Sequence, residues 1–199
     1  DRFFDSLTAV LEATPAVGRR LDEPSERLLN RYCYALGCFE TIYRSGWGAV
    51  SGSPLFLNPL DEVEDFLALA EPEWIEDLNR QSWLFFDSHP ELLHRWAVLN
   101  PGFDGSADVG GADADMILGG FLIDFKATVK SRLDKKMLHQ LLGYVLLDYE
   151  DRHQLEGVGI YMSRQGRFFE WTMAEFLELL GQKRAPPELR AEFREVVAR

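Results

Sequence analysis

The sequence predicts an α/β fold, in which a small mixed β-sheet is flanked by helices and preceded by a helical extension. Two observations predict it. Apolar side chains in the N-terminal half recur mostly at helical spacing, whereas after residue 101 two pairs of strand-like segments surround one amphipathic segment. We expect a single domain over residues 1–199. Its parts are a mainly helical part (1–100), a core (101–172) and C-terminal helices (173–199).

The N-terminal part is expected to begin with two helices. Apolar positions at helical spacing predict the first over residues 1–13, and Thr14-Pro15 ends it. Residues 24–44 repeat apolar side chains at i, i+3, i+4 and i+7 and predict the second. The Gly-, Ser- and Pro-rich stretch over residues 46–59 indicates a loop. Two further helices are expected at 60–70 and 90–99, and the segment 71–89 between them shows no clear period and stays unassigned.

The core begins after the turn signal Asn100-Pro101-Gly102, where the apolar period changes. The segments ADADMIL and FLIDFKAT flank Gly119-Gly120 and predict two strands joined by a tight hairpin. A helix capped by Ser131 or Asp134 is expected next. The segments LEGVGIYMS and GRFFEWT then predict a second strand pair, and the three helices are expected at 134–151, 173–180 and 187–197.

The hairpin register gathers charge on one face. If Leu118 pairs with Phe121, counting back places Asp115 opposite Asp124 and Asp113 opposite Lys126, all on one side of the hairpin. Two carboxylates opposed at about 5 Å repel by roughly 3 kcal/mol at an effective dielectric near 20. A Mg²⁺ ion reverses that cost, and a nearby lysine can neutralise charge developing on a phosphate. The alternative is an exposed hairpin with a weak Asp113–Lys126 ion pair.

Three motifs together resemble the PD-(D/E)xK nuclease superfamily, in particular its RecB-type exonuclease branch. They are Gly110-Gly111-Ala112-Asp113-Ala114-Asp115, then Asp124-Phe125-Lys126, then Gln140-Leu141-Leu142-Gly143-Tyr144. The match covers about residues 109–161, and the proline of the family name is replaced by Ala114. The resemblance implies a restriction-endonuclease-like core and a Mg²⁺- or Mn²⁺-dependent nuclease that hydrolyses phosphodiester bonds of DNA, in phage defence or DNA repair.

The same resemblance implies roles for individual residues. Asp115, Asp124 and the backbone carbonyl of Phe125 or Ile123 would bind the metal, with Glu40 as a further ligand from a preceding helix. Lys126 and Gln140 would be catalytic, and Tyr144 would line the substrate site. The alternative for this helix face is that Tyr144 is a core residue and Gln140 its solvated neighbour. Asp113 is the alternative first ligand; Asp115 is favoured because it is expected to face Asp124 directly.

Charge limits the partners that the chain can hold. A net charge of −12 and a pI near 4.8 predict weak DNA binding by the protein alone, because non-specific affinity comes from Lys and Arg contacting phosphates. A protein partner or a homo-oligomer would then help. The dense basic run Lys130, Arg132, Lys135 and Lys136 offers phosphates a cationic rim, with Lys130 and Lys135 as substrate contacts, or is a solvated helix start.

The sequence also bears on other classes of protein, namely membrane proteins, secreted proteins and proteins of the same fold that are not nucleases. No apolar run approaches the roughly 18 residues that cross a bilayer, and the first residues lack the pattern of a secretory signal, so a cytoplasmic protein without membrane association is expected. The main alternative to a nuclease is a catalytically inactive nuclease-fold scaffold or binding subunit of a larger complex, which the acidic charge favours. Another is a metal-assisted hydrolase of RNA or a small nucleotide.

Overall fold

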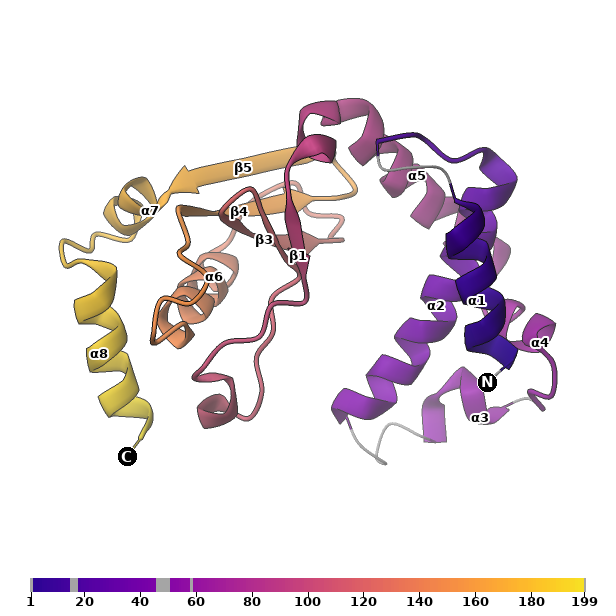
Figure 1. Cartoon of the computed structure of the whole chain (residues 1–199), viewed down its shortest axis with the longest axis horizontal. Coiled ribbons are helices and arrows are strands. Elements are labelled where there is room, and N and C mark those ends of the chain that lie inside the picture. Colours follow the sequence, from indigo (N-terminus) through magenta and orange to yellow (C-terminus); the bar gives the residue numbers. More distant parts are fainter. Residues whose placement is uncertain (1, 15–17, 46–50, 58, 199) are drawn as a thin grey trace. The chain divides into compact units, whose positions relative to one another are not determined.

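The chain folds into two compact units, Asp1–Asp87 and Ser88–Arg199, which are described separately (Figure 1). The computed structural model describes residues 2–14, 18–45, 51–57 and 59–198. Both elements expected of an α/β protein, helices and a mixed sheet, are present. Among the described helices, none combines the length and the apolar character that crossing a membrane requires.

The first unit is helical. The predicted first two helices are confirmed, and they pack through Phe3, Tyr32 and Ala35. A short helix lies in the stretch predicted to be a loop, of which residues 46–50 and 58 fall outside the described ones. The unassigned segment is also a helix, whose face buries Ile75. The helices are α1 (Arg2–Ala13), α2 (Glu23–Ser45), α3 (Pro54–Leu57), α4 (Val63–Leu67) and α5 (Pro72–Ser88).

The second unit contains a five-stranded sheet in the order β1-β2-β3-β4-β5. Strands β3 and β4 are parallel, and the other neighbours are antiparallel. The strands are β1 (Ala97–Leu99), β2 (Met116–Leu118), β3 (Phe121–Lys126), β4 (Gly157–Met162) and β5 (Arg167–Thr172). The helical elements are η2 (Pro90–His94), η3 (Ser106–Val109), α6 (Lys135–Leu147), α7 (Met173–Leu179) and α8 (Pro186–Val197).

One predicted helix is wrong. The segment 90–99 forms the 3₁₀ helix η2 and then the edge strand β1, which pairs with β2 through Ala97 and Leu118. Leu92 is buried and fixes the 3₁₀ turn, while all three residues of β1 are exposed. A three-residue exposed strand has no apolar alternation, so pairing with β2, rather than local pattern, determines its conformation.

Helix α6 connects the two parallel strands and covers one face of the sheet. Parallel neighbours require such a crossover, because the chain leaves the first strand at one end of the sheet and enters the second strand at the other end. Leu122 of β3 and Ile160 of β4 are fully buried in one cluster with Leu141 and Val145 of α6. Of the two predicted caps, Asp134 is the one that caps the helix, and it accepts a 3.1 Å hydrogen bond from the Met137 amide. The end of β3 is thereby held against the first turns of α6.

A buried arginine fixes the other end of α6. Arg190 of α8 donates from Nε to the Val145 carbonyl at 3.0 Å and pairs with Asp151 at 2.8 Å. Its other guanidinium nitrogen lies 3.8 Å from the carboxylate of Asp148, which is fully buried. Asp148 also accepts the backbone N–H of Arg152 at 3.0 Å. These charge-assisted contacts satisfy groups that would be costly to bury unpaired.

Candidate active site

The hairpin that presents the site has the predicted turn. Gly119 and Gly120 have φ values of 58° and 89°, which glycine adopts readily, and Leu118 pairs with Phe121. The ladder then continues only to Met116 and its partner Ile123. Beyond that pair β2 and β3 separate, so the register predicted for the hairpin holds over the turn but not over the charged residues that precede β2.

Asp113 is not opposite Lys126, and that prediction is wrong. Asp113 forms an isolated antiparallel bridge with Gly102, and the Ala114 amide donates to the Pro101 carbonyl at 3.2 Å. The chain before β2 therefore follows the segment that leaves β1 rather than β3. Backbone pairing with residues 101–102 pulls this segment away, a tertiary contact that counting from the turn does not include.

Asp115 still reaches β3, but through its side chain. Its Oδ2 accepts a 2.6 Å hydrogen bond from the backbone N–H of Phe125, one residue beyond the buried Asp124. The N–H and C=O of a strand residue point toward the same edge. The Phe125 carbonyl therefore lies on the edge of β3 that faces Asp115, and it is one of the two carbonyls that the motif resemblance implies as metal ligands.

Asp124 is a buried carboxylate beside a lysine. Its exposed fraction is 3%, and its Oδ2 lies 2.5 Å from Lys126 Nζ. Burial raises the pKa of Asp124 above its ordinary value, the contact with Lys126 lowers it in part, and the carboxylate of Asp115 raises it again. The two aspartates are thus close enough to affect each other, although no ladder pairs them.

A short polar chain extends from Lys126 along α6. Lys126 Nζ donates to Gln140 Oε1 at 2.8 Å, and Gln140 Nε2 donates to the Tyr144 hydroxyl at 2.8 Å. Burial raises the pKa of Tyr144, the Gln140 hydrogen bond opposes this, and both aspartates raise it further. The structure therefore brings together Lys126, Gln140 and Tyr144 with the two carboxylates.

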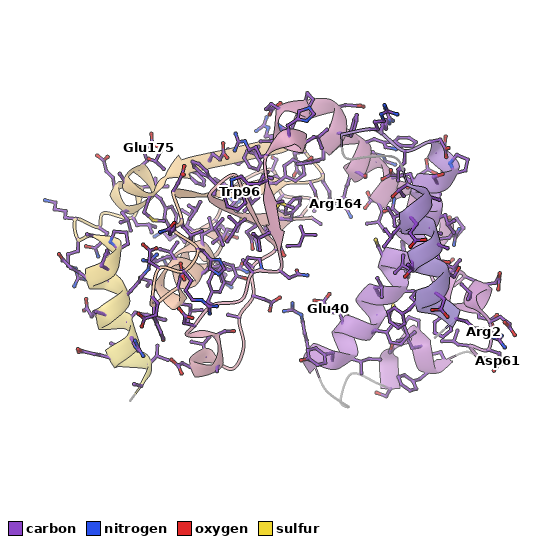
Figure 2. All side chains as sticks on the ribbon, in the orientation of Figure 1. Arg2, Glu40, Asp61, Trp96, Arg164 and Glu175 are labelled. Carbon is purple, nitrogen blue, oxygen red and sulfur yellow. The ribbon has the colours of Figure 1, made fainter. Side chains whose placement is uncertain are left out.

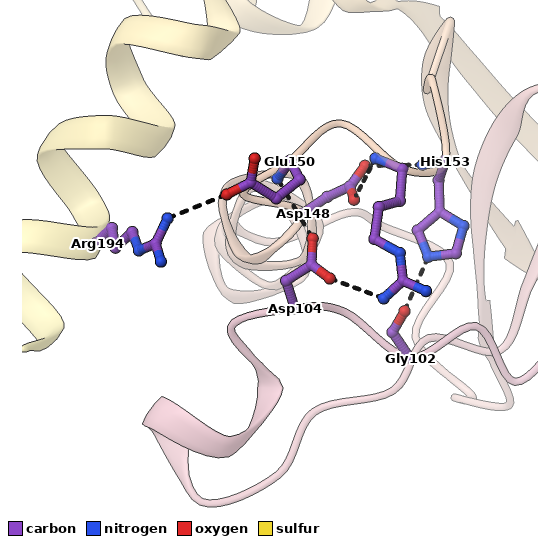
Figure 3. Close-up of polar contacts among 7 residues, drawn as sticks. Gly102, Asp104, Asp148, Glu150, His153 and Arg194 are labelled. Carbon is purple, nitrogen blue, oxygen red and sulfur yellow. Dashed lines mark hydrogen bonds and ion pairs between the residues drawn. The ribbon is translucent and has the colours of Figure 1, made fainter.

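Phe103, which no sequence pattern indicated, packs against Tyr144. Their rings stack with centroids 5.5 Å apart at an interplanar angle of 19°. Both neighbours of Phe103 are tied to the loop after α6, because His153 Nε2 donates to the Gly102 carbonyl at 2.8 Å and Arg152 bonds Asp104 at 2.7 Å (Figure 3). An isolated aromatic residue after a turn carries no periodic signal that would have identified it.

The basic loop between β3 and α6 is anchored through its backbone. Arg164 lies in the turn between β4 and β5 (Figure 2). Its guanidinium donates to the Ala127 carbonyl at 3.2 Å, and the Gln165 side-chain amide donates to the Thr128 carbonyl at 3.1 Å. The loop start is thus fixed by the β4–β5 turn. The predicted rim residues are all exposed: Lys130, Arg132, Lys135 and Lys136.

Glu40 belongs to the first unit. It lies on α2, where it forms an i, i+4 ion pair with Arg44 at 2.8 Å (Figure 2). Such exposed pairs contribute less than about 1 kcal/mol. Its surroundings in that unit are those of a surface charge, and its metal-binding role stays a prediction.

The donor set fits a hard cation. Asp115, Asp124 and the Phe125 carbonyl offer oxygen atoms only, and Mg²⁺ is commonly held by one or two carboxylates while it keeps several waters. Within the described residues no group of three or more His, Cys, Asp or Glu side chains is placed to hold a metal. A structural zinc site with four protein ligands therefore does not fit this arrangement.

Comparison with protein-family models, with curated proteins and with solved structures found no match to this chain.

Proposed function

We propose that the protein is a metal-dependent nuclease that hydrolyses phosphodiester bonds of DNA, with Mg²⁺ or Mn²⁺ as its cofactor. One observation carries the proposal. The buried carboxylate of Asp124 lies beside both a second carboxylate, Asp115, and the ammonium of Lys126, which Gln140 and Tyr144 hold in place. Asp124 is buried and Asp115 is exposed, and a buried carboxylate next to a second carboxylate is costly unless cations balance their charge, which favours a metal site over a structural one.

Each residue has a role in this chemistry. Asp115, Asp124 and the Phe125 carbonyl would hold the ion, which when bound activates water and stabilises the departing oxygen. The Lys126 ammonium has three N–H groups, of which Asp124 and Gln140 engage two, and the third can donate to a phosphate oxygen. Gln140 fixes the direction of that donor, and the Tyr144 hydroxyl fixes the Gln140 amide in turn.

The direct test is cleavage of labelled DNA by the purified protein with Mg²⁺ or Mn²⁺. Lys126→Ala should lower the rate by roughly 10²–10³-fold or more, as expected when a donor to the reacting group is removed. Lys183→Ala, which changes an exposed lysine after α7, should cut at the wild-type rate. Circular dichroism of each variant checks the fold. Cleavage by a folded Lys126→Ala protein at the wild-type rate would defeat the proposal.

A second candidate is a catalytically inactive scaffold with a nuclease-like fold. The net charge of −12 favours it, because an acidic protein holds nucleic acid weakly by itself. Calorimetric titration with Mn²⁺ separates the two. A nuclease should bind the ion in the wild type and lose binding in Asp124→Ala, whereas a wild type that binds no ion, or an unaffected variant, would favour the scaffold. A role in phage defence or DNA repair is proposed for the nuclease only.

A further inference from the structure

We infer that Lys136, on the first turn of α6, binds the phosphate next to the one that is cut, and that Lys135 does not touch the substrate. This inference rests on the proposed nuclease function and makes the substrate a polynucleotide rather than a small nucleotide. The sequence alone treats the two adjacent lysines alike, because both belong to one basic run. The orientation of α6 separates them.

The helical phase of α6 is fixed by its contacts at both faces. Leu141 and Val145 lie in the core under the sheet, and Gln140 bonds Lys126. With 3.6 residues per turn, Lys136 lies only about 40° around the helix axis from Gln140, whereas Lys135 lies about 140° away. Lys136 therefore extends the polar stripe of Gln140 by one turn. Lys135 is on the opposite flank of the helix.

The charge of Lys136 is available for a phosphate. The side chain is exposed, and no described carboxylate forms an ion pair with it. The first turn of α6 contains no acidic residue. A cation at the N-terminal end of a helix interacts unfavourably with the helix dipole, so helix stability does not account for Lys136.

The spacing suits neighbouring phosphates of one strand. Residues four apart on a helix have Cβ atoms about 5–6 Å apart, and Gln140 directs Lys126 at the reacting phosphate. Lys136, one turn earlier, then reaches the adjacent phosphate. Residues 126–136 hold five of the 21 Lys and Arg residues of the chain, its densest basic stretch, which favours this part of an otherwise acidic protein for contact with a nucleic-acid backbone.

The test compares Lys136→Ala with the matched variant Lys135→Ala, using a labelled single-stranded oligonucleotide. For Lys136→Ala we expect KM to rise about five- to tenfold with little change in kcat, since a contact made equally in the ground and transition states is lost. The dependence of log affinity on log salt should become shallower by about 0.7, the loss of one phosphate contact. Lys135→Ala should match the wild type, and Lys136→Arg should restore KM.

The outcomes separate the two proposals. If the wild type cleaves the oligonucleotide but Lys136→Ala and Lys135→Ala have equal KM values, or an unchanged salt slope, the assignment of Lys136 is wrong and the nuclease function stands. If the wild type neither binds nor cleaves the oligonucleotide, both are wrong. A loss of kcat alone in Lys136→Ala would also contradict a contact that only binds the strand.

Discussion

The carboxylate of Asp115 accepts a hydrogen bond from the Phe125 amide at 2.6 Å although the two residues are not paired in the sheet. The side chain takes the place of a ladder partner at the point where β2 leaves β3. One carboxylate oxygen is used for this bond, and the other stays available beside Asp124. The same contact thus orients Asp115 and completes the end of β3.

This geometry distinguishes Asp115 from Asp113 as the first metal ligand. We predict that Asp115→Ala weakens Mn²⁺ binding by at least about tenfold, equal to ~1.4 kcal/mol, when measured by titration calorimetry. Asp113→Ala should stay within about twofold of the wild type, because the backbone of Asp113 pairs with Gly102 and not with β3, which carries Asp124. Equal losses of Mn²⁺ affinity in the two variants would contradict the assignment of Asp115, and not Asp113, as the first metal ligand.

Phe103 should affect catalysis through Tyr144. Phe103→Leu removes the ring stacked on Tyr144, which loosens Gln140 and the donor direction of Lys126, so we predict a fall in kcat with KM nearly unchanged. The matched control is Phe176→Leu, which alters a fully buried ring of the same core on α7. Both changes should cost about 1–3 kcal/mol of unfolding free energy.

Steady-state kinetics and urea denaturation together test this pair. The Phe176→Leu protein should lose stability but keep kcat. If both variants lose kcat in proportion to their stability, Phe103 is simply a core residue. Phe103→Tyr, which retains the ring, should recover most of kcat.

The phenol of Tyr161 should lose its proton at a higher pH than an ordinary tyrosine. Its ring is buried against Phe125 and Phe168, and burial raises the pKa of Tyr161 to about 12. The unfolded chain releases this proton near pH 10, so from about pH 10 to 12 the folded state holds a proton that the unfolded state has lost. The contribution of Tyr161 to stability is therefore complete below about pH 10 and declines as the pH rises above it.

Two measurements check this titration. Tyrosinate absorbance should show a step near pH 12 that Tyr161→Phe removes. Urea denaturation at about pH 9 and about pH 11 should show a smaller fall in unfolding free energy for Tyr161→Phe than for the wild type. An identical pH dependence in both proteins would contradict a raised pKa at this phenol.

The elements with strong local signals were predictable from sequence. The apolar periods of α1, α2 and α6 and the Gly119-Gly120 turn are encoded by neighbouring residues, and the structure has all of them. Strand β1 was not predictable, because its three exposed residues are strands only through pairing with β2. Helix α5 has a buried face, but its period was obscured by large side chains on other faces, among them the half-exposed Trp74.

The site shows the same division. The Asp124-Phe125-Lys126 triplet and the i, i+4 spacing of Gln140 and Tyr144 are local, and the structure places these side chains in contact. The position of Asp113 depends on Gly102, which is eleven residues away in sequence, and turn counting could not include it. Phe103 and the anchors of the basic loop were missed for the same reason, because they act through tertiary contacts.

The two-residue turn at Gly119-Gly120 also bears on how such a site can change during evolution. One residue added between this turn and Asp124 would shift β3 by one position and move the carboxylate to the opposite face of the sheet. Residues added between Lys130 and Leu133 would only lengthen a surface loop, at small entropic cost. Related sequences can therefore vary in length in the loop between Lys130 and Leu133, whereas the hairpin before Lys126 has to keep its length.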